Sequence, residues 1–451
     1  MIFCVKNFFE VDCFASLAMT MRPVHNDKSY LILYNKAMNL ENLKNIQPLI
    51  DDYTLKNYVA GVNVLLYKDN KELGYWQSGW ADIENGKKYE RNTICRMYSM
   101  SKTITAAAAY KLIEQGKLDL GQDLAFYLPY FADLQVCETP GRKGTPRKAA
   151  RPILIQDLLN MTSGYTYGAW SEQGTLCEHL TSDLINELNE DAAGPNKITT
   201  QDFARRISKI PVSFEPGTDY QYGYSADILG AVIEKVAGMR FGDFLKENIF
   251  NPLGMNDTDF YVPADKQSRL SNVYRCNMSY TADGQTPSAT LEPFTSCNLG
   301  ISHKMDRMPA FQSGGAGLCS TIDDYARFGL MLVNGGQLDG ARILNPGTVS
   351  FMSNAQLPAP LQQKFDQKMP HLSGYTYCNL LRIAKNPGES KALTTRGEYG
   401  WDGWLGPYIG IDPANNLVFL MTMQRCDTGT MDLTRLVKNM IYSLLENHPL
   451  K

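Results

Sequence analysis

Ser99 and Lys102 lie three residues apart at the start of a predicted helix, in the stretch YSMSKTITAAAAYKLIEQGKLDL. Side chains at this spacing share one face of a helix, so the Lys102 amine can accept the hydroxyl proton of Ser99. The amine must be neutral to do so, which requires burial or a nearby cation to lower its pKa. Backbone amides at the helix N-terminus would also stabilise an oxyanion on an acylated serine.

The same stretch has a purely structural interpretation. Ser99 or Ser101 can cap the helix, with Lys102 in solvent. A chain of this size and composition contains about one serine-x-x-lysine by chance. On this stretch alone, the catalytic and the structural interpretations are equally supported.

Other catalytic systems find little support in the sequence. There is no G-x-S-x-G turn, and the five histidines stand in no motif that pairs them with a serine and an acid. No H-E-x-x-H motif or histidine cluster suggests a metal. The ten cysteines are scattered without C-x-x-C pairs, which favours reduced, mostly buried thiols. Because the nucleophile, base and oxyanion donors of the catalytic interpretation are all protein groups, we expect neither a metal nor an organic cofactor.

The elements that would position these residues are strands near both ends of the chain and helices in its middle. Strand hairpins are predicted at residues 61–80 and 408–424, and residues 120–300 are mainly helix and loop. Further helices are expected from Met38, from Ser101 to Gln115 with Gly116 as its stop, at 321–336, and at 434–446. This pattern predicts one α/β domain, built from residues 38–120 and 320–451, with an α-helical subdomain inserted at 121–319.

Residues 1–37 fit this organisation poorly, because they show no periodicity. We interpret them as an N-terminal extension, with Met38 as an alternative start. Their apolar run is interrupted by charges, so no secretory signal is recognised and a cytoplasmic location is expected. No stretch reaches the ~18 apolar residues of a membrane span. A net charge of -3 does not indicate nucleic-acid binding.

The Ser99 stretch resembles the S-x-x-K helix of the serine β-lactamase and penicillin-binding protein superfamily, in its class C-like branch. Further stretches resemble recurrent blocks of that branch in the same order: ILIQDLLNMTSGY (153–165), FEPGTDYQYGYSADILGAVIEKVAG (214–238), NPLGMNDTDF (251–260) and GGAGLCSTIDDYARFGLMLVNGG (314–336). The resemblance implies a β-lactamase/transpeptidase-like α/β (α+β) fold, with an antiparallel sheet flanked by helices and an inserted helical subdomain. It also implies a serine hydrolase that forms an acyl-enzyme on Ser99.

The second catalytic element of this superfamily is a tyrosine shortly before a D-x-L-G sequence. In YGYSADILG this position falls on Tyr222, five residues before Asp227. The resemblance implies that Tyr222 is either the base or a proton relay between Lys102 and the leaving group. The neighbouring Tyr220 and Tyr224 leave other registers open. Tyr224 stands where many relatives carry asparagine, so either a part in substrate binding or a place in the pocket wall is expected.

The third element is a K-T-G triplet on a strand, and this chain has none. The matching segment YGWDGWLG places Trp401, Asp402 and Gly403 at the triplet, which resembles the family VIII carboxylesterases. Gly403 would keep the strand close to substrate, and the Trp404 amide would join that of Ser99 in an oxyanion hole. Trp401 offers a flat apolar face, or is a core aromatic at a strand end. Asp402 would repel the carboxylate of a β-lactam.

These features predict a serine hydrolase that acts as a carboxylesterase on small, uncharged or hydrophobic esters. Alternatives with the same chemistry are a β-lactamase, a D-amino-acid peptidase or amide hydrolase, and an acyltransferase. An alternative from another class is a non-catalytic protein that binds a ligand or a peptidoglycan fragment. The expected partner is a small-molecule ester or amide, and the oligomeric state does not follow from the sequence.

Overall fold

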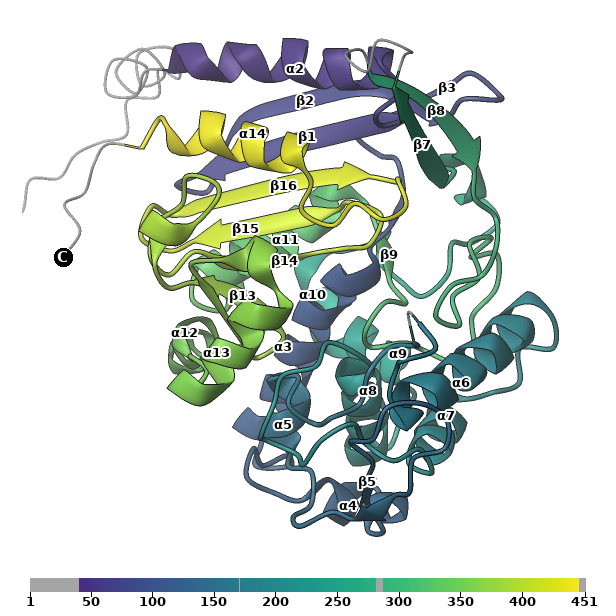
Figure 1. Ribbon diagram of the computed structural model, residues 1–451. Coiled ribbons are helices and arrows are strands. Elements are labelled where there is room, and N and C mark those ends of the chain that lie inside the picture. The colour runs from purple at the N-terminus through teal and green to yellow at the C-terminus, as the bar shows by residue number, and fades with distance from the viewer. Residues whose placement is uncertain (1–39, 170, 281–286, 446–451) are drawn as a thin grey trace, which may run out of the picture. The chain divides into compact units, whose positions relative to one another are not determined.

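The computed structural model describes residues 40–445, except residue 170 and residues 281–286. The predicted extension at residues 1–37 lies outside the described residues. The described chain is built around a large antiparallel sheet with helices on both of its faces (Figure 1). This confirms the predicted fold class.

The central sheet joins the two ends of the chain. Its strand order is β12-β13-β14-β15-β16-β1-β2-β3, and every neighbouring pair is antiparallel. The strands are β1 (Gly61–Lys68), β2 (Lys71–Asp82), β3 (Lys87–Lys88), β12 (Tyr375–Cys378), β13 (Leu381–Ala384), β14 (Tyr399–Asp402), β15 (Tyr408–Asp412) and β16 (Leu417–Met423). Both predicted hairpins are confirmed as β1–β2 and β15–β16, and β1 pairs directly with β16.

Apolar strands explain why both faces of this sheet are covered. All residues of β16 are buried, as are the first six of β1, so neither strand has a face that tolerates water. Helix α2 (Ile46–Leu55) packs against β2, and α14 (Asp432–Tyr442) packs against α2 (Figure 1). Helix α11 (Ile322–Val333) packs against β15 and β16.

The middle of the chain is mainly helical. Its helices are α4 (Leu124–Tyr127), α5 (Ile155–Leu159), α6 (Leu176–Ala193), α7 (Thr200–Ile207), α8 (Ser225–Ala237), α9 (Phe241–Leu245) and α10 (Asn251–Leu253). This stretch also contains a strand hairpin, β7 (Tyr274–Tyr280) with β8 (Pro287–Pro293), that the sequence analysis did not anticipate. Helices α12 (Pro346–Asn354) and α13 (Ala359–Lys368) follow later. The exact boundaries of a helical subdomain stay a prediction.

Short two-stranded pairings fasten the loops around this framework. They join β4 (Cys95–Arg96) to β9 (Cys319–Ser320), β5 (Gln135–Val136) to β6 (Arg147–Lys148), and β10 (Gln337–Leu338) to β11 (Ala341–Arg342). The eight described cysteines are all free, and six of them are buried. Within residues 40–445, apart from the gaps, no helix is long and apolar enough to cross a membrane.

Helix α3 (Ser101–Glu114) is the element that carries the serine-x-x-lysine segment into the interior. It packs against α8 and touches β14, and its four alanines, Ala106 to Ala109, are all fully buried. Small side chains allow this close approach on several sides. The helix ends as predicted before Gly116, which adopts a left-handed φ of 67°. A short 3-10 turn, η2 (Tyr98–Met100), precedes α3 and presents Ser99 between the sheet and the helices.

Candidate active site

The structure brings Ser99 and Lys102 together. Lys102 Nζ donates to Ser99 Oγ at 3.1 Å, to the Tyr167 hydroxyl at 3.1 Å and to the Gly315 carbonyl at 2.8 Å. Lys102 is fully buried, whereas Ser99 is half-buried and reaches a cavity. No side chain caps the start of α3, and the Ser101 hydroxyl accepts from the Leu318 amide instead. The geometry therefore fits the catalytic interpretation of the segment better than helix capping.

Burial lowers the pKa of Lys102 to about 7, and the negative charges of Asp227 and Asp402 oppose this shift. The desolvated ammonium loses more hydration energy than these two carboxylates return. Asp227 lies nearby because its Oδ1 accepts from the Gly315 amide at 3.1 Å, while the Gly315 carbonyl contacts Lys102. At pH 7 the Lys102 amine is consequently neutral, and able to accept a proton, in a large fraction of the protein molecules.

Tyr222 completes the polar group around Ser99. A hydrogen bond with Ser99 and another with Trp401 act on the Tyr222 hydroxyl, and its ring centroid lies 4.7 Å from Lys102 Nζ. Trp401 Nε1 donates to the Tyr222 hydroxyl at 2.9 Å. Burial raises the pKa of Tyr222 above its ordinary value, despite these two hydrogen bonds. The phenol is thus neutral at physiological pH, which suits a relay better than a phenolate base.

Tyr167 is a member of this group that the sequence analysis missed. Its hydroxyl accepts from Lys102, and its ring packs edge-on against Tyr222 at 5.8 Å and against Tyr224 at 4.9 Å. It follows the MTSGY block by two residues, but no spacing rule links that loop to Ser99. Tyr224 itself is buried behind Tyr167 and is not among the residues that line the cavity around Ser99. Its position allows it to support Tyr167.

The end of β14 forms the opposite wall of the cavity, and the substrate-binding role expected of residues 401–404 stays a prediction. The Trp401 ring lies 5.6 Å from that of Tyr222 and 4.8 Å from that of Tyr377. A Cβ on Gly403 would lie 2.3 Å from the Met97 carbonyl oxygen, so only glycine lets the strand approach the turn that carries Ser99. Among the described residues, the Trp404 amide has no hydrogen-bond acceptor. It is therefore available to a ligand.

A cavity of about 840 Å³ opens beside these residues. Its lining includes Ser99, Tyr167, Tyr222, Trp401, Asp402 and Trp404. Aromatic walls with a few convergent polar groups are typical of small-molecule sites. Arg275 and Asp427 also line it, and they pair with each other at 3.2 Å. Asp402 accepts from the Thr430 hydroxyl and has no cationic partner within 4 Å among the described residues.

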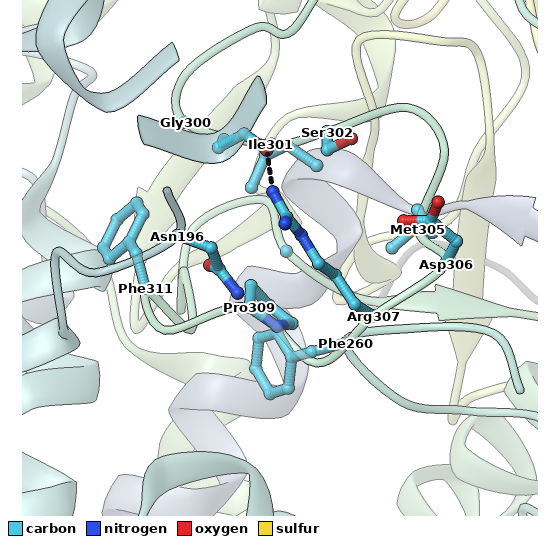
Figure 2. Close-up of a pocket in the computed structure, with 12 residues that line it drawn as sticks. Asn196, Phe260, Gly300, Ile301, Ser302, Met305, Asp306, Arg307, Pro309 and Phe311 are labelled. Atoms are coloured by element: carbon cyan, nitrogen blue, oxygen red, sulfur yellow. Dashed lines mark hydrogen bonds between the residues drawn. The ribbon is translucent and has the colours of Figure 1, made fainter. Parts of the chain in front are cut away.

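A separate, smaller cavity of about 30 Å³ lies around Gly300 and Phe260 (Figure 2). Arg307 reaches across it (Figure 2), and its Nη2 donates to the Ala192 carbonyl at 3.0 Å. No serine in its lining has a lysine or histidine partner. In the described part of the chain, no cluster of three histidine, cysteine or acidic side chains could hold a metal ion. The cavity at Ser99 is thus the candidate active site.

Comparisons with known proteins identify the family of this chain. The sequence profile of the family described as Beta-lactamase matches residues 46–437. Protein Rv1367c of Mycobacterium tuberculosis is 28% identical over 395 residues, which cover 87% of this chain and 92% of that protein. Esterase EstB of Burkholderia gladioli is 25% identical over 413 residues, covering 88% of this chain and 94% of the esterase.

The fold has close counterparts among solved structures. EstCE1, a hydrolase with promiscuous acyltransferase activity, superposes with a TM-score of 0.71 at 22% identity, covering 91% of this chain and 100% of that one. A family VIII carboxylesterase superposes with a TM-score of 0.60 at 17% identity, covering 90% and 98%. At this sequence identity, the similarity to these two structures supports the fold and nothing more.

Proposed function

Because the chain belongs to the Beta-lactamase family, whose relatives are serine hydrolases, we propose that it is a carboxylesterase acting through an acyl-enzyme on Ser99. The observation that carries this proposal is the hydrogen bond from the buried Lys102 amine to Ser99 Oγ, beside Tyr222. A pKa near 7 equips this lysine as a general base at physiological pH.

In the proposed mechanism, neutral Lys102 accepts the hydroxyl proton as Ser99 Oγ attacks the ester carbonyl carbon. The amides of Ser99 and Trp404 hold the resulting oxyanion. Tyr222 donates its proton to the leaving alkoxide and regains one from protonated Lys102, which leaves an acylated serine and a free alcohol. Water then attacks the acyl-enzyme by the same route in reverse and releases the carboxylic acid.

Two features of the cavity support ester over β-lactam substrates. Trp401 and Trp404 supply flat apolar surface, and Asp402 stands where β-lactamases carry a residue that binds a carboxylate. A carboxylate close to Asp402 would be repelled rather than bound. The relative EstB is named an esterase, which agrees with this choice. A cytoplasmic location stays a prediction.

Turnover of p-nitrophenyl butyrate and of a chromogenic cephalosporin by the purified protein tests this proposal. We expect rapid release of nitrophenol, slow cephalosporin cleavage, and an acyl adduct on the Ser99 peptide in rapidly quenched samples. Fast cephalosporin hydrolysis would contradict the ester preference while retaining Ser99. If neither substrate is turned over and Ser99 is not acylated, an amide substrate or a binding role replaces the proposal.

Tyr222→Phe is expected to lower kcat for p-nitrophenyl butyrate by roughly 10²–10³-fold, because the leaving alkoxide loses its proton donor. Tyr220→Phe provides a matched control. Its buried hydroxyl has no hydrogen-bond partner among the described residues, so kcat should change by less than about threefold. Steady-state kinetics on both variants also decides the register of the tyrosine motif. The reverse pattern would move the catalytic role to Tyr220.

Asp402→Asn is expected to relax discrimination against anionic esters. We predict that the wild type has a lower kcat/KM for p-nitrophenyl hemiglutarate than for its neutral methyl ester. The ratio of kcat/KM for the neutral ester to kcat/KM for the anionic ester should be about tenfold smaller in the variant, as removal of one nearby charge implies. Added salt should weaken the discrimination in the wild type. Asp133→Asn removes an exposed charge elsewhere and should leave the ratio unchanged. Equal ratios in the wild type and Asp402→Asn would show that Asp402 does not select substrate charge.

A further inference from the structure

A second small cavity, of about 30 Å³, carries an unusual set of charges. Four cationic side chains line it and no carboxylate does: Arg382, Lys391, Arg435 and Lys438. The cavity lies where β13 and α14 meet the segment around Ser390. It shares His371 and Leu372 with the active-site cavity but includes neither Ser99 nor Tyr222. It is therefore a separate feature of the molecule.

Arg382 is the deepest of these cations, with 1% of its surface exposed. Its Nη2 donates to the Tyr408 hydroxyl at 2.7 Å and lies 3.5 Å from Glu398 Oε1. Nε and Nη1 have no acceptor among the described residues. The Thr434 hydroxyl in the same lining is also buried without a partner. A buried donor without an acceptor destabilises the fold. Arg382 Nε and Nη1 on β13 and the Thr434 hydroxyl on α14 are therefore three groups that a ligand in this cavity could satisfy.

The carboxylates near the cavity do not balance its cations. The fully buried Glu398 forms ion pairs with both Lys438 and Arg382. Asp402 is held by Thr430, which lines the cavity. Lys391 and Arg435 have no carboxylate within 4 Å in the described part of the chain. Arg382 and Lys438 are buried, whereas Arg435 is half-buried and Lys391 is exposed. Two buried cations thus share the carboxylate of Glu398, and this buried excess of positive charge favours a counter-ion.

We propose that this cavity binds a small inorganic anion of chloride size. A space of 30 Å³ accommodates one particle slightly larger than water, whereas a phosphate would not be enclosed. The anion accepts hydrogen bonds from the free Arg382 groups and from Thr434, and so links β13 to α14. Because these elements come from different parts of the chain, anion binding stabilises the native packing.

Crystals grown in sodium bromide give the direct test, because bromide is located by its anomalous scattering. We expect an anomalous peak within about 3.5 Å of Arg382 Nε or Nη1, the distance of a long hydrogen bond to a halide. Ordered water there without a peak would overturn the proposal. This readout uses the wild-type protein and does not depend on the esterase assignment.

Thermal unfolding gives a second readout. At equal ionic strength, chloride is expected to raise Tm by roughly 2 °C over gluconate, the size of a modest linkage effect. Thr434→Val, which is nearly isosteric, and Arg435→Gln should lose most of this rise. Arg142→Gln, at an exposed arginine paired with Asp183, should retain it. A chloride response unchanged in both cavity variants would overturn the proposal.

Discussion

Ser99→Ala is expected to lower kcat/KM for p-nitrophenyl butyrate by at least about 10⁴-fold, since loss of the nucleophile removes the acyl-enzyme route. The Ser99 side chain is half-buried and its hydrogen bonds go to other members of the site. We therefore expect Tm to fall little, if at all. Initial rates, together with thermal unfolding, separate lost chemistry from lost structure.

Ser101→Ala is the matched control for this variant. Its hydroxyl is fully buried and accepts from the Leu318 amide, so the substitution leaves that donor unpaired. We expect a loss of about 1–3 kcal/mol in unfolding free energy with most of the activity retained in the folded enzyme. If activity survived in Ser99→Ala but disappeared in folded Ser101→Ala, the nucleophile would be Ser101 and not Ser99.

Lys102→Arg is expected to be almost as damaging, with kcat lowered by roughly 10³–10⁴-fold. An arginine keeps the positive charge but stays protonated at every accessible pH, so it cannot accept the Ser99 proton. Lys102→Met removes the amine altogether and should be similarly inactive. Rates at pH 7.5 for both variants, with circular dichroism to confirm folding, provide the measurement. Appreciable turnover by Lys102→Arg would show that another group is the base.

The pH dependence of the wild-type enzyme follows from the same group. Lys102 is a base only when neutral, so kcat/KM should rise with pH through about 7 and then level off. An acidic limb with its midpoint near the ordinary pKa of a carboxyl group would instead implicate an aspartate or glutamate.

The stability of the folded protein should also rise with pH because of Lys102, over the range between its folded and unfolded pKa values. Between pH 7 and 10.5 the unfolded chain holds a proton on this amine that the folded protein has released. The free energy of unfolding therefore increases as pH rises over this range. At neutral pH, Lys102→Met avoids this desolvation and should have a higher Tm than the wild type. A lower Tm would mean that the hydrogen bonds of Lys102 outweigh its desolvation.

The sequence alone predicted several of the elements, but not the pairing of β7 with β8, and it named most of the residues of the candidate site. Period-2 and period-3.6 patterns predicted both hairpins and α3, because these patterns record local burial along the chain. The resemblance of ordered blocks predicted the fold, and placed Ser99, Lys102, Tyr222 and the segment from Trp401 to Trp404. Ser99, Tyr222, Trp401, Asp402 and Trp404 line one cavity. Lys102 is buried beside Ser99, and Tyr224 is not among the lining residues.

Only the tertiary structure decided the features that depend on distant parts of the chain. The lowered pKa of Lys102 comes from burial among several elements, which no local pattern encodes. Tyr167 reaches Lys102 from a loop 65 residues away. The unpaired groups of Arg382 become visible only where β13 meets α14. Spacing along a helix or strand is a property of sequence, whereas desolvation and unmet hydrogen bonds arise only when separate segments pack together.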